Sequence, residues 1–227
     1  MPPRTTEPCP TREGGHARRA RLLVVRHGES VWNAEGRWQG QADIPLTDLG
    51  RRQAASAARA LGSVDLIAAS DLVRARETAE IIAAALGAGP VVVEAGLRER
   101  DAGAWSGLTR AEIHARYPGY LSDDPVTGSA YGGPRFPADW EPDEQLVARA
   151  LSALDRLADT MDAGTGFVVS HGGVVGALQQ HMTGERYRRL PNLAGAWFER
   201  SPSGWVVGER VQLLDGLDVA VTVPSEI

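Results

Sequence analysis

Two short apolar segments lie far apart in the chain, and each is followed two residues later by a histidine and then by a glycine. Leu22–Val25 precedes His27, and Phe167–Val169 precedes His171. Short runs of apolar, partly β-branched residues are typical of buried strands. Ligands of open α/β sheets bind beyond the carboxyl ends of the strands. We therefore expect two neighbouring strands to bring both imidazoles to one pocket.

Further strands and helices alternate between and around these two segments. Asp65–Ala69 and Val91–Val93 are predicted strands, and an apolar stripe recurs at helical spacing from Leu72 to Leu86. Further helices are predicted at about 48–61, 110–117, 143–162 and 174–182. This alternation predicts an α/β fold, a three-layer α/β/α sandwich with a mostly parallel central sheet. A hairpin, 197–199 with 205–211, would add an antiparallel edge strand.

The chain of 227 residues is long enough for one domain of good size. We expect that domain at about 21–214, after a disordered N-terminal tail (1–20) that is rich in Pro, Thr, Gly and Arg. An irregular, Gly- and Pro-rich insertion at about 118–142 is expected to form a lid over the site. Residues 215–227 are expected to form a C-terminal tail.

Composition excludes several classes of function. The net charge of −5 gives no general attraction to nucleic acid or membranes, and no apolar run reaches the length of a membrane helix. A single cysteine excludes a disulfide framework and a cysteine-based zinc site within the chain, which favours a cytoplasmic location. All 24 basic residues are arginine, so a P-loop lysine and Schiff-base chemistry are excluded.

Five residues together predict a pocket for a small, highly charged anion: Arg26, His27, Arg74, Glu99 and His171. Arginine suits phosphate, helix N-termini add partial positive charge, and an imidazole can attack phosphorus directly. Glu99 follows the third strand and could supply a proton to the leaving group, although an ion pair with a flanking arginine is an alternative role. Spacing alone does not distinguish Arg74 from Arg76.

Four blocks of sequence resemble, in chain order, the signature of the histidine phosphatase (phosphoglycerate mutase-like) superfamily. They are Leu23-Val24-Val25-Arg26-His27-Gly28-Glu29-Ser30 with Asn33, then Ser70-Asp71-Leu72-Val73-Arg74-Ala75-Arg76-Glu77-Thr78-Ala79, then Leu97-Arg98-Glu99 with Gly103, Trp105 and Gly107, and finally Ser170-His171-Gly172-Gly173. The similarity extends over about 22–213. It implies a phosphoglycerate mutase-like fold and favours Arg74 over Arg76, because the family's arginine precedes Ala-x-x-Thr-Ala.

The resemblance also implies roles for individual residues. His27 would be the nucleophile that forms a phosphohistidine, and Glu99 would be the proton donor and then the base that activates water. Arg26, Arg74 and His171 would bind the phosphoryl group and stabilise the transition state. Further phosphate or substrate contacts are expected from Asn33, Gln39, Gly40 and Gly172. The resemblance implies no metal and no cofactor.

The resemblance leaves the reaction open between a phosphatase, a cofactor-dependent phosphoglycerate mutase and a module that binds phosphorylated ligands without turnover. Mutases of the family resemble one another in an Asn two residues after the second catalytic histidine, where this chain has Gly173. The insertion at 118–142 has one basic residue, Arg135, against four acidic ones, and would hold a second anionic group poorly. We therefore expect hydrolysis.

The expected substrate is a small phosphorylated metabolite, a sugar phosphate or phosphoglycerate derivative. The layout is also similar to that of actinobacterial family members proposed as glucosyl-phosphoglycerate phosphatases. A homodimer stays open, since the edge hairpin with Trp197 and Trp205 could pair with a second copy or simply pack.

Overall fold

A six-stranded mixed sheet forms the centre of the molecule. The computed structural model describes residues 20–121, 135–161, 163–185 and 189–222. The strand order is β3-β2-β4-β1-β5-β6; the first four are parallel, while β5 is antiparallel to both β1 and β6. The strands are β1 (Ala20–Arg26), β2 (Leu66–Ala69), β3 (Val92–Val93), β4 (Gly164–Ser170), β5 (Ala194–Ser201) and β6 (Gly204–Gln212). The expected α/β fold with an antiparallel edge is confirmed.

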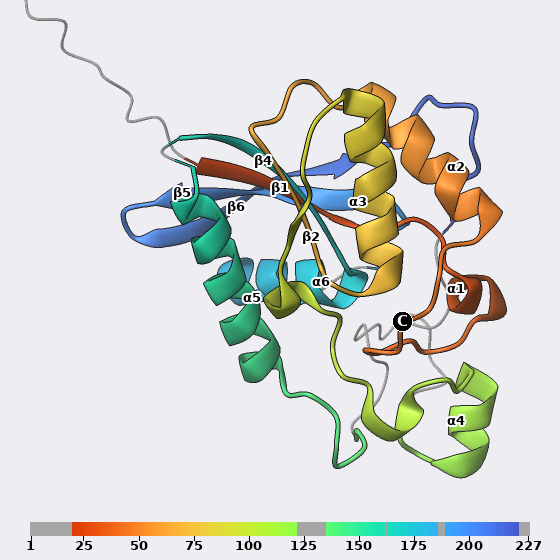
Figure 1. Cartoon of the computed structure of the whole chain (residues 1–227). Helices are drawn as coiled ribbons and strands as arrows, with labels where there is room; N and C mark the ends of the chain where they lie inside the picture. Colours follow the sequence, from red (N-terminus) through yellow and green to blue (C-terminus); the bar gives the residue numbers. More distant parts are fainter. Residues whose placement is uncertain (1–19, 122–134, 162, 186–188, 223–227) are drawn as a thin grey trace, which may run out of the picture.

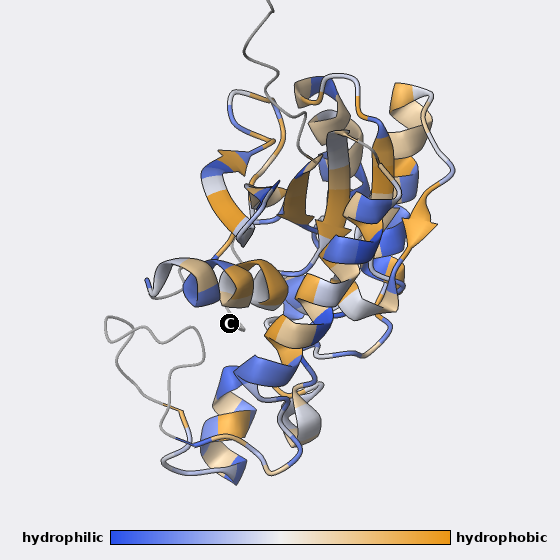
Figure 2. Cartoon of the chain, turned by 90° about the vertical axis from the view of Figure 1, so that its left-hand side faces the viewer, coloured by the Kyte–Doolittle hydropathy of each residue, from blue (hydrophilic) through white to orange (hydrophobic). Residues whose placement is uncertain are grey.

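Helices cover both faces of this sheet (Figure 1). Successive side chains of a strand point to opposite faces. Leu22 and Val24 of β1 accordingly pack with α5 (Asp143–Asp159) and α6 (Gly172–Thr183). Leu23 and Val25 pack with α2 (Asp48–Ala57) and α3 (Val73–Leu86) on the other face. The three-layer arrangement is confirmed by these two packed faces, and Figure 2 shows mostly hydrophobic strands beside helices of mixed hydropathy.

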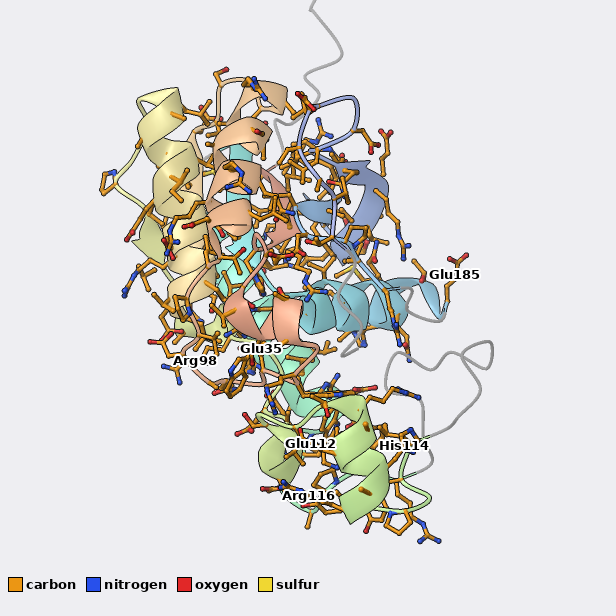
Figure 3. All side chains as sticks on the ribbon, turned by 90° about the vertical axis from the view of Figure 1, so that its right-hand side faces the viewer. Glu35, Arg98, Glu112, His114, Arg116 and Glu185 are labelled. Atoms are coloured by element: carbon orange, nitrogen blue, oxygen red, sulfur yellow. The ribbon has the colours of Figure 1, made fainter. Side chains whose placement is uncertain are left out.

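A separate small core lies outside the three layers, around α4 (Arg110–Arg116). Thr109 and Glu112 form the expected capping box, in which each side chain accepts a hydrogen bond from the other residue's backbone N–H. Figure 3 shows Glu112, His114 and Arg116 on this helix, apart from the sheet. An edge-to-face pair of Trp38 and Trp105 lies at the centre of this core, with ring centroids 5.3 Å apart.

Several local features differ from the sequence-based expectations. A five-residue helix, α1 (Val31–Glu35), follows β1 and was not expected; its cap is Ser30, whose side chain accepts from the backbone of Asn33. Short 3₁₀ turns in the described ranges were not expected either: η1 (Ala58–Ala60), η2 (Ala95–Leu97) and η3 (Gly103–Trp105). Turns this short carry too few residues for a hydrophobic period to become visible.

The terminal segments and the insertion are described only in part. Ala20, the last residue of the expected tail, pairs with Gly164 as the start of β1, and the remainder of that tail lies outside the described residues. Of the expected lid, 118–121 and 135–142 are described. Residues 215–222 run back along α2, where Gln53 donates to the carbonyl of Ala220. None of the helices in the described part of the chain has the length and apolarity that crossing a membrane requires.

Candidate active site

Each of the four parallel strands delivers a candidate residue to the carboxyl edge of the sheet. β1 and β4 are in register with Arg26 opposite Ser170, so His27 and His171 follow at the same level. Arg74 lies in the first turn of α3, after β2, and Glu99 follows β3. All of these side chains are buried. The sheet topology therefore brings together the five residues that the sequence analysis singled out.

The ring of His27 is held in one tautomer. Its Nδ1 lies 2.6 Å from the carbonyl oxygen of Gly28, which only accepts, so Nδ1 carries the proton. The lone pair is then on Nε2, which accepts a hydrogen bond of 3.1 Å from Arg74 Nε. Burial, and then the positive charges of Arg74 and Arg26, hold the pKa of His27 well below its ordinary value. His27 thus presents a neutral ring nitrogen to the pocket, with its lone pair accepting the N–H of Arg74.

His171 lies beside it, with the two ring centroids 5.2 Å apart at an angle of 63°. Its side chain is fully buried, and neither ring nitrogen makes a hydrogen bond to any residue of the described part of the chain. Buried polar atoms are almost always paired in native proteins. Burial, and then the charges of Arg74 and its other neighbours, also lower the pKa of His171. An imidazole in this position is suited to a polar ligand.

Two arginines supply the positive charge. Arg26 Nη1 donates to the carbonyl of Leu190 at 3.1 Å. Arg74 donates to the carbonyls of Ala42 and Gly40 at 2.7 and 2.9 Å, and these bonds aim its Nε at His27. Because both guanidiniums are buried beside neutral imidazoles, the pocket has a strongly positive character.

Glu99 lies across the pocket and accepts from two backbone N–H groups. Its Oε1 binds the N–H of Arg100 at 2.7 Å, and its Oε2 binds the N–H of Gly173 in the first turn of α6 at 3.0 Å. The alternative role was an ion pair with a flanking arginine, but the ion pairs described for both flanking arginines go to other carboxylates: Arg100 pairs with Asp143 at 2.6 Å and Arg98 with Asp71. Arg98 points outward (Figure 3) and makes a bidentate ion pair with Asp71. The carboxyl group of Glu99 is therefore available to the pocket.

The remaining candidate residues divide into two groups. Gln39 and Gly40 line the small cavity in front of His27, together with Trp38, Arg26, Arg74 and Glu99. Gly40 has a φ of +50°, and a Cβ there would lie 2.9 Å from the backbone N of Ala102, so only glycine fits. Asn33 is buried and is not part of this lining; its Oδ1 accepts from the backbone of Ser30 at 3.2 Å. Gly172 opens α6 directly after His171.

The sequence analysis missed a second layer of polar residues behind His27. Asn192 is fully buried, and its Nδ2 donates to the carbonyl of His27 at 2.8 Å. Thr222 in turn donates to Oδ1 of Asn192 at 2.7 Å, and Gln53 accepts from the N–H of Glu29 at 2.8 Å. The bond from Asn192 joins segments more than a hundred residues apart, and no local pattern signals it.

Chemistry rather than size distinguishes the cavity at His27. A larger hollow between α2 and residues 217–220 is lined by aliphatic, serine, arginine and aspartate side chains, without a histidine or glutamate. Among the described residues there is no cluster of three or more His, Cys, Asp or Glu side chains that could hold a metal ion.

Comparison with known proteins extends over almost the whole described chain. Residues 22–208 match the family model of the histidine phosphatase superfamily (branch 1). A probable phosphoglycerate mutase GpmB of Klebsiella pneumoniae is 38% identical over 206 residues, which cover 82% of this chain and 90% of that protein. A metal-independent phosphoserine phosphatase of Arabidopsis thaliana is 34% identical over 165 residues, 71% of this chain and 68% of that protein.

Solved structures give the same fold. The mycobacterial glucosyl-3-phosphoglycerate phosphatase, determined as a complex with VO3, superposes with a TM-score of 0.67 at 31% sequence identity. The superposition covers 85% of this chain and 98% of that one. The names of these relatives thus include both mutases and phosphatases.

Proposed function

The chain belongs to the histidine phosphatase superfamily and is a phosphoric monoester hydrolase, and on this premise we propose that it works without a metal, through a phosphohistidine at His27. Its substrate would be a small phosphorylated metabolite. The proposal assigns attack on phosphorus to His27, phosphoryl binding to Arg26, Arg74 and His171, and proton transfer to Glu99.

In the first step, Nε2 of His27 attacks phosphorus and the bond between phosphorus and the ester oxygen breaks. The departing oxygen takes a proton from the carboxyl group of Glu99, so the alcohol leaves neutral. Since the lone pair of Nε2 cannot attack while it accepts from Arg74, the Arg74 N–H must turn to a phosphoryl oxygen when substrate binds. Nδ1 keeps its proton on the carbonyl of Gly28, so positive charge developing on the ring is delocalised toward that carbonyl.

In the second step, the carboxylate of Glu99 takes a proton from water, and the water oxygen attacks phosphorus. The bond between phosphorus and Nε2 breaks, inorganic phosphate leaves, and Glu99 is again protonated for the next cycle. The arginines and His171 bind the equatorial oxygens in both steps, where negative charge concentrates in the transition state.

One observation carries the proposal: a buried, neutral His27 has its Nδ1 bound to a carbonyl and its Nε2 directed at a positively charged cavity. The group that donates to Nε2 is the guanidinium of Arg74, which lines the same cavity, so an incoming phosphoryl group can take over this N–H and release the lone pair. Glu99 at the same cavity supports proton transfer to the leaving group.

Hydrolysis of p-nitrophenyl phosphate in the presence of a chelator tests the proposal. We expect activity that survives the chelator and disappears in His27→Ala, together with an acid-labile, base-stable phosphoenzyme in the unaltered chain. Metal-free activity that persists in His27→Ala would overturn the mechanism, and activity restored only by added metal would overturn metal independence.

A mutase remains the second candidate, because several relatives carry that name. Gly173 offers only its backbone N–H, which binds Glu99, and supplies no side chain at the position where mutases of the family carry an asparagine. We therefore propose that hydrolysis predominates. Isomerisation of phosphoglycerate that is faster than its hydrolysis and depends on a bisphosphoglycerate primer would favour the mutase.

The names of the relatives share a phosphorylated carboxylic acid: phosphoglycerate, phosphoserine and glucosyl-3-phosphoglycerate. We propose that the substrate is of this kind, and that screening should begin with phosphoglycerates, phosphoserine and sugar-linked phosphoglycerates, with nucleotides as the comparison set. Rates within one order of magnitude across the whole set would contradict the proposed preference.

A cytoplasmic location and a homodimer stay predictions.

A further inference from the structure

Glu99 lies in a segment that is not part of a β-strand. It follows the two-residue strand β3 and the turn η2, and its backbone carbonyls are bound by side chains from elsewhere. Ser170 Oγ donates to the carbonyl of Leu97 at 2.9 Å, and Gln41 Nε2 donates to that of Glu99 at 3.1 Å. The other side-chain bonds described for these carbonyls come from Arg149.

Arg149, on α5, binds three of these carbonyls with one guanidinium. Its Nη1 donates to the carbonyls of Gly96 and Arg98 at 2.9 and 2.6 Å, and its Nη2 donates to that of Glu99 at 2.9 Å. The planar fork of arginine can make such divergent bonds at once, whereas the single ammonium of lysine cannot. The position of the Glu99 backbone therefore depends on where this one guanidinium lies.

The guanidinium of Arg149 is itself bound by Glu141, which lies near the end of the expected lid segment (118–142). Arg149 Nε and Nη2 make a bidentate ion pair with Glu141 at 2.6 and 2.8 Å, and only 11% of the glutamate side chain is exposed. Glu141 also binds Asp101 in both directions, through its backbone N–H at 3.0 Å and its Oε2 at 3.1 Å. The chain on both sides of Glu99 is thus tied to the same pair.

We infer that Arg149, braced by Glu141, is the positioning residue that holds Glu99 in register with the leaving group. The inference rests on the proposed function, in which Glu99 transfers the proton. Arg149 is absent from the lining of the cavity at His27, so it acts through the backbone of residues 96–99 rather than on substrate.

The same helix provides a matched control. Arg156 lies seven residues further on, two helical turns along the same face, and makes its own bidentate pair with Glu94 at 2.9 and 2.8 Å. The hydrogen bonds described for Arg156 go to Glu94, whereas Arg149 binds three carbonyls of the Glu99 segment. Substituting each arginine in turn therefore distinguishes the loss of the bonds to the Glu99 segment from the general effect of removing an arginine of α5 that pairs with a glutamate.

The experiment compares Arg149→Ala, Arg149→Lys and Arg156→Ala on two substrates, p-nitrophenyl phosphate and an alkyl phosphate. An alkyl leaving group needs the proton from Glu99 and a nitrophenolate scarcely does. A positioned general acid is worth about 10²–10⁴-fold, so we expect Arg149→Ala to lower kcat/KM about 100-fold on the alkyl phosphate and less than about tenfold on the nitrophenyl ester. Lysine should not rescue it, and Arg156→Ala should stay within about threefold of the unaltered chain on both.

A second readout follows the phosphoenzyme. Because Glu99 also activates water, Arg149→Ala should release a burst of nitrophenolate and accumulate phosphohistidine, which a merely destabilised enzyme would not do. If Arg149→Ala does not fold, Glu141→Gln is the alternative, because glutamine has the shape of glutamate without its charge. This variant should also lose more kcat/KM on the alkyl phosphate than on the nitrophenyl ester, with a smaller loss than in Arg149→Ala. Equal losses on both substrates, or losses no larger than those of Arg156→Ala, would overturn the inference. An unaltered chain inactive on both substrates would instead show that the proposed function is wrong.

Discussion

The two sides of the pocket are built in different ways. His27 and His171 follow neighbouring strands whose backbone hydrogen bonds fix their relative level, with Arg26 opposite Ser170. Glu99 follows the shortest strand of the sheet and is placed by side chains that bind its backbone. The side of the proposed nucleophile is therefore specified by a cooperative sheet, and the side of the proposed proton donor by a few individual side chains.

This difference suggests how the two sides should respond to substitution. A strand ladder tolerates the loss of a single side chain, because many backbone bonds hold its geometry. The segment that carries Glu99 should be more sensitive, since removing the guanidinium of Arg149 releases three of its carbonyls together. Four predictions test the comparison, in order of decreasing expected effect.

The largest effect is expected from His27→Asn on the nucleophile side. Asparagine can still donate to the carbonyl of Gly28 but cannot attack phosphorus, so kcat should fall by about 10⁴-fold or more with little change in folding. Steady-state kinetics with p-nitrophenyl phosphate and phosphoenzyme trapping measure it. A trapped phosphoenzyme in this variant would place the nucleophile elsewhere.

Glu99→Gln should cost less and leave a different signature. The amide oxygen keeps one of the two backbone contacts, while proton transfer is lost, so the rate on an alkyl phosphate should fall about 10²–10⁴-fold. With p-nitrophenyl phosphate, whose leaving group scarcely needs the proton, the phosphoenzyme of this variant should accumulate, whereas the His27 variant should form none. Rapid-quench measurement distinguishes the two sides, and a Glu99→Gln variant that forms no phosphoenzyme would remove the proposed distinction.

The third substitution, Asn192→Ala, tests whether the position of His27 also depends on a single side chain. The substitution removes the donor to the buried carbonyl of His27 and the acceptor of the Thr222 hydroxyl proton, so it should destabilise the fold by about 1–3 kcal/mol. Urea unfolding measures this loss, with Thr222→Val as the smaller, matched change. If kcat falls more than 100-fold while stability is unchanged, the nucleophile side is as dependent on single side chains as the loop side.

The smallest effect concerns pH. His27 and His171 have pKa values lowered by burial and by Arg74, so below pH 6.5 the unfolded chain binds more protons than the folded one. Stability should therefore decline as the pH falls from about 6.5 toward the lowered values and should be level, as far as these groups are concerned, above about 7.5. Chemical unfolding at several pH values checks this, with His171→Asn expected to decline less. A steeper decline in the variant would contradict the assigned direction.

The sequence by itself determined the fold class and the sheet-side residues, for a physical reason. Alternating and helical hydrophobic periods are local, so the strands that end in His27 and His171 and the stripe from Leu72 to Leu86 are visible without coordinates. The family motifs then favoured Arg74 over Arg76 and implied the role of Glu99, and the structure brings both residues to the same cavity as His27. The five-residue helix α1 was too short to leave a period.

Only the tertiary structure decided what holds those residues. Arg149 binds carbonyls about fifty residues earlier in the chain, and Asn192 binds that of His27 across 165 residues. The segment 215–222, expected only as a tail, supplies Ala220 and Thr222 to the layer behind the nucleophile. Apart from the bond between Thr222 and Asn192, these bonds join a side chain to a backbone carbonyl, which every residue has, so no residue type at the receiving end signals them. Their existence depends on distance in the folded chain, and distance is what the sequence pattern does not contain.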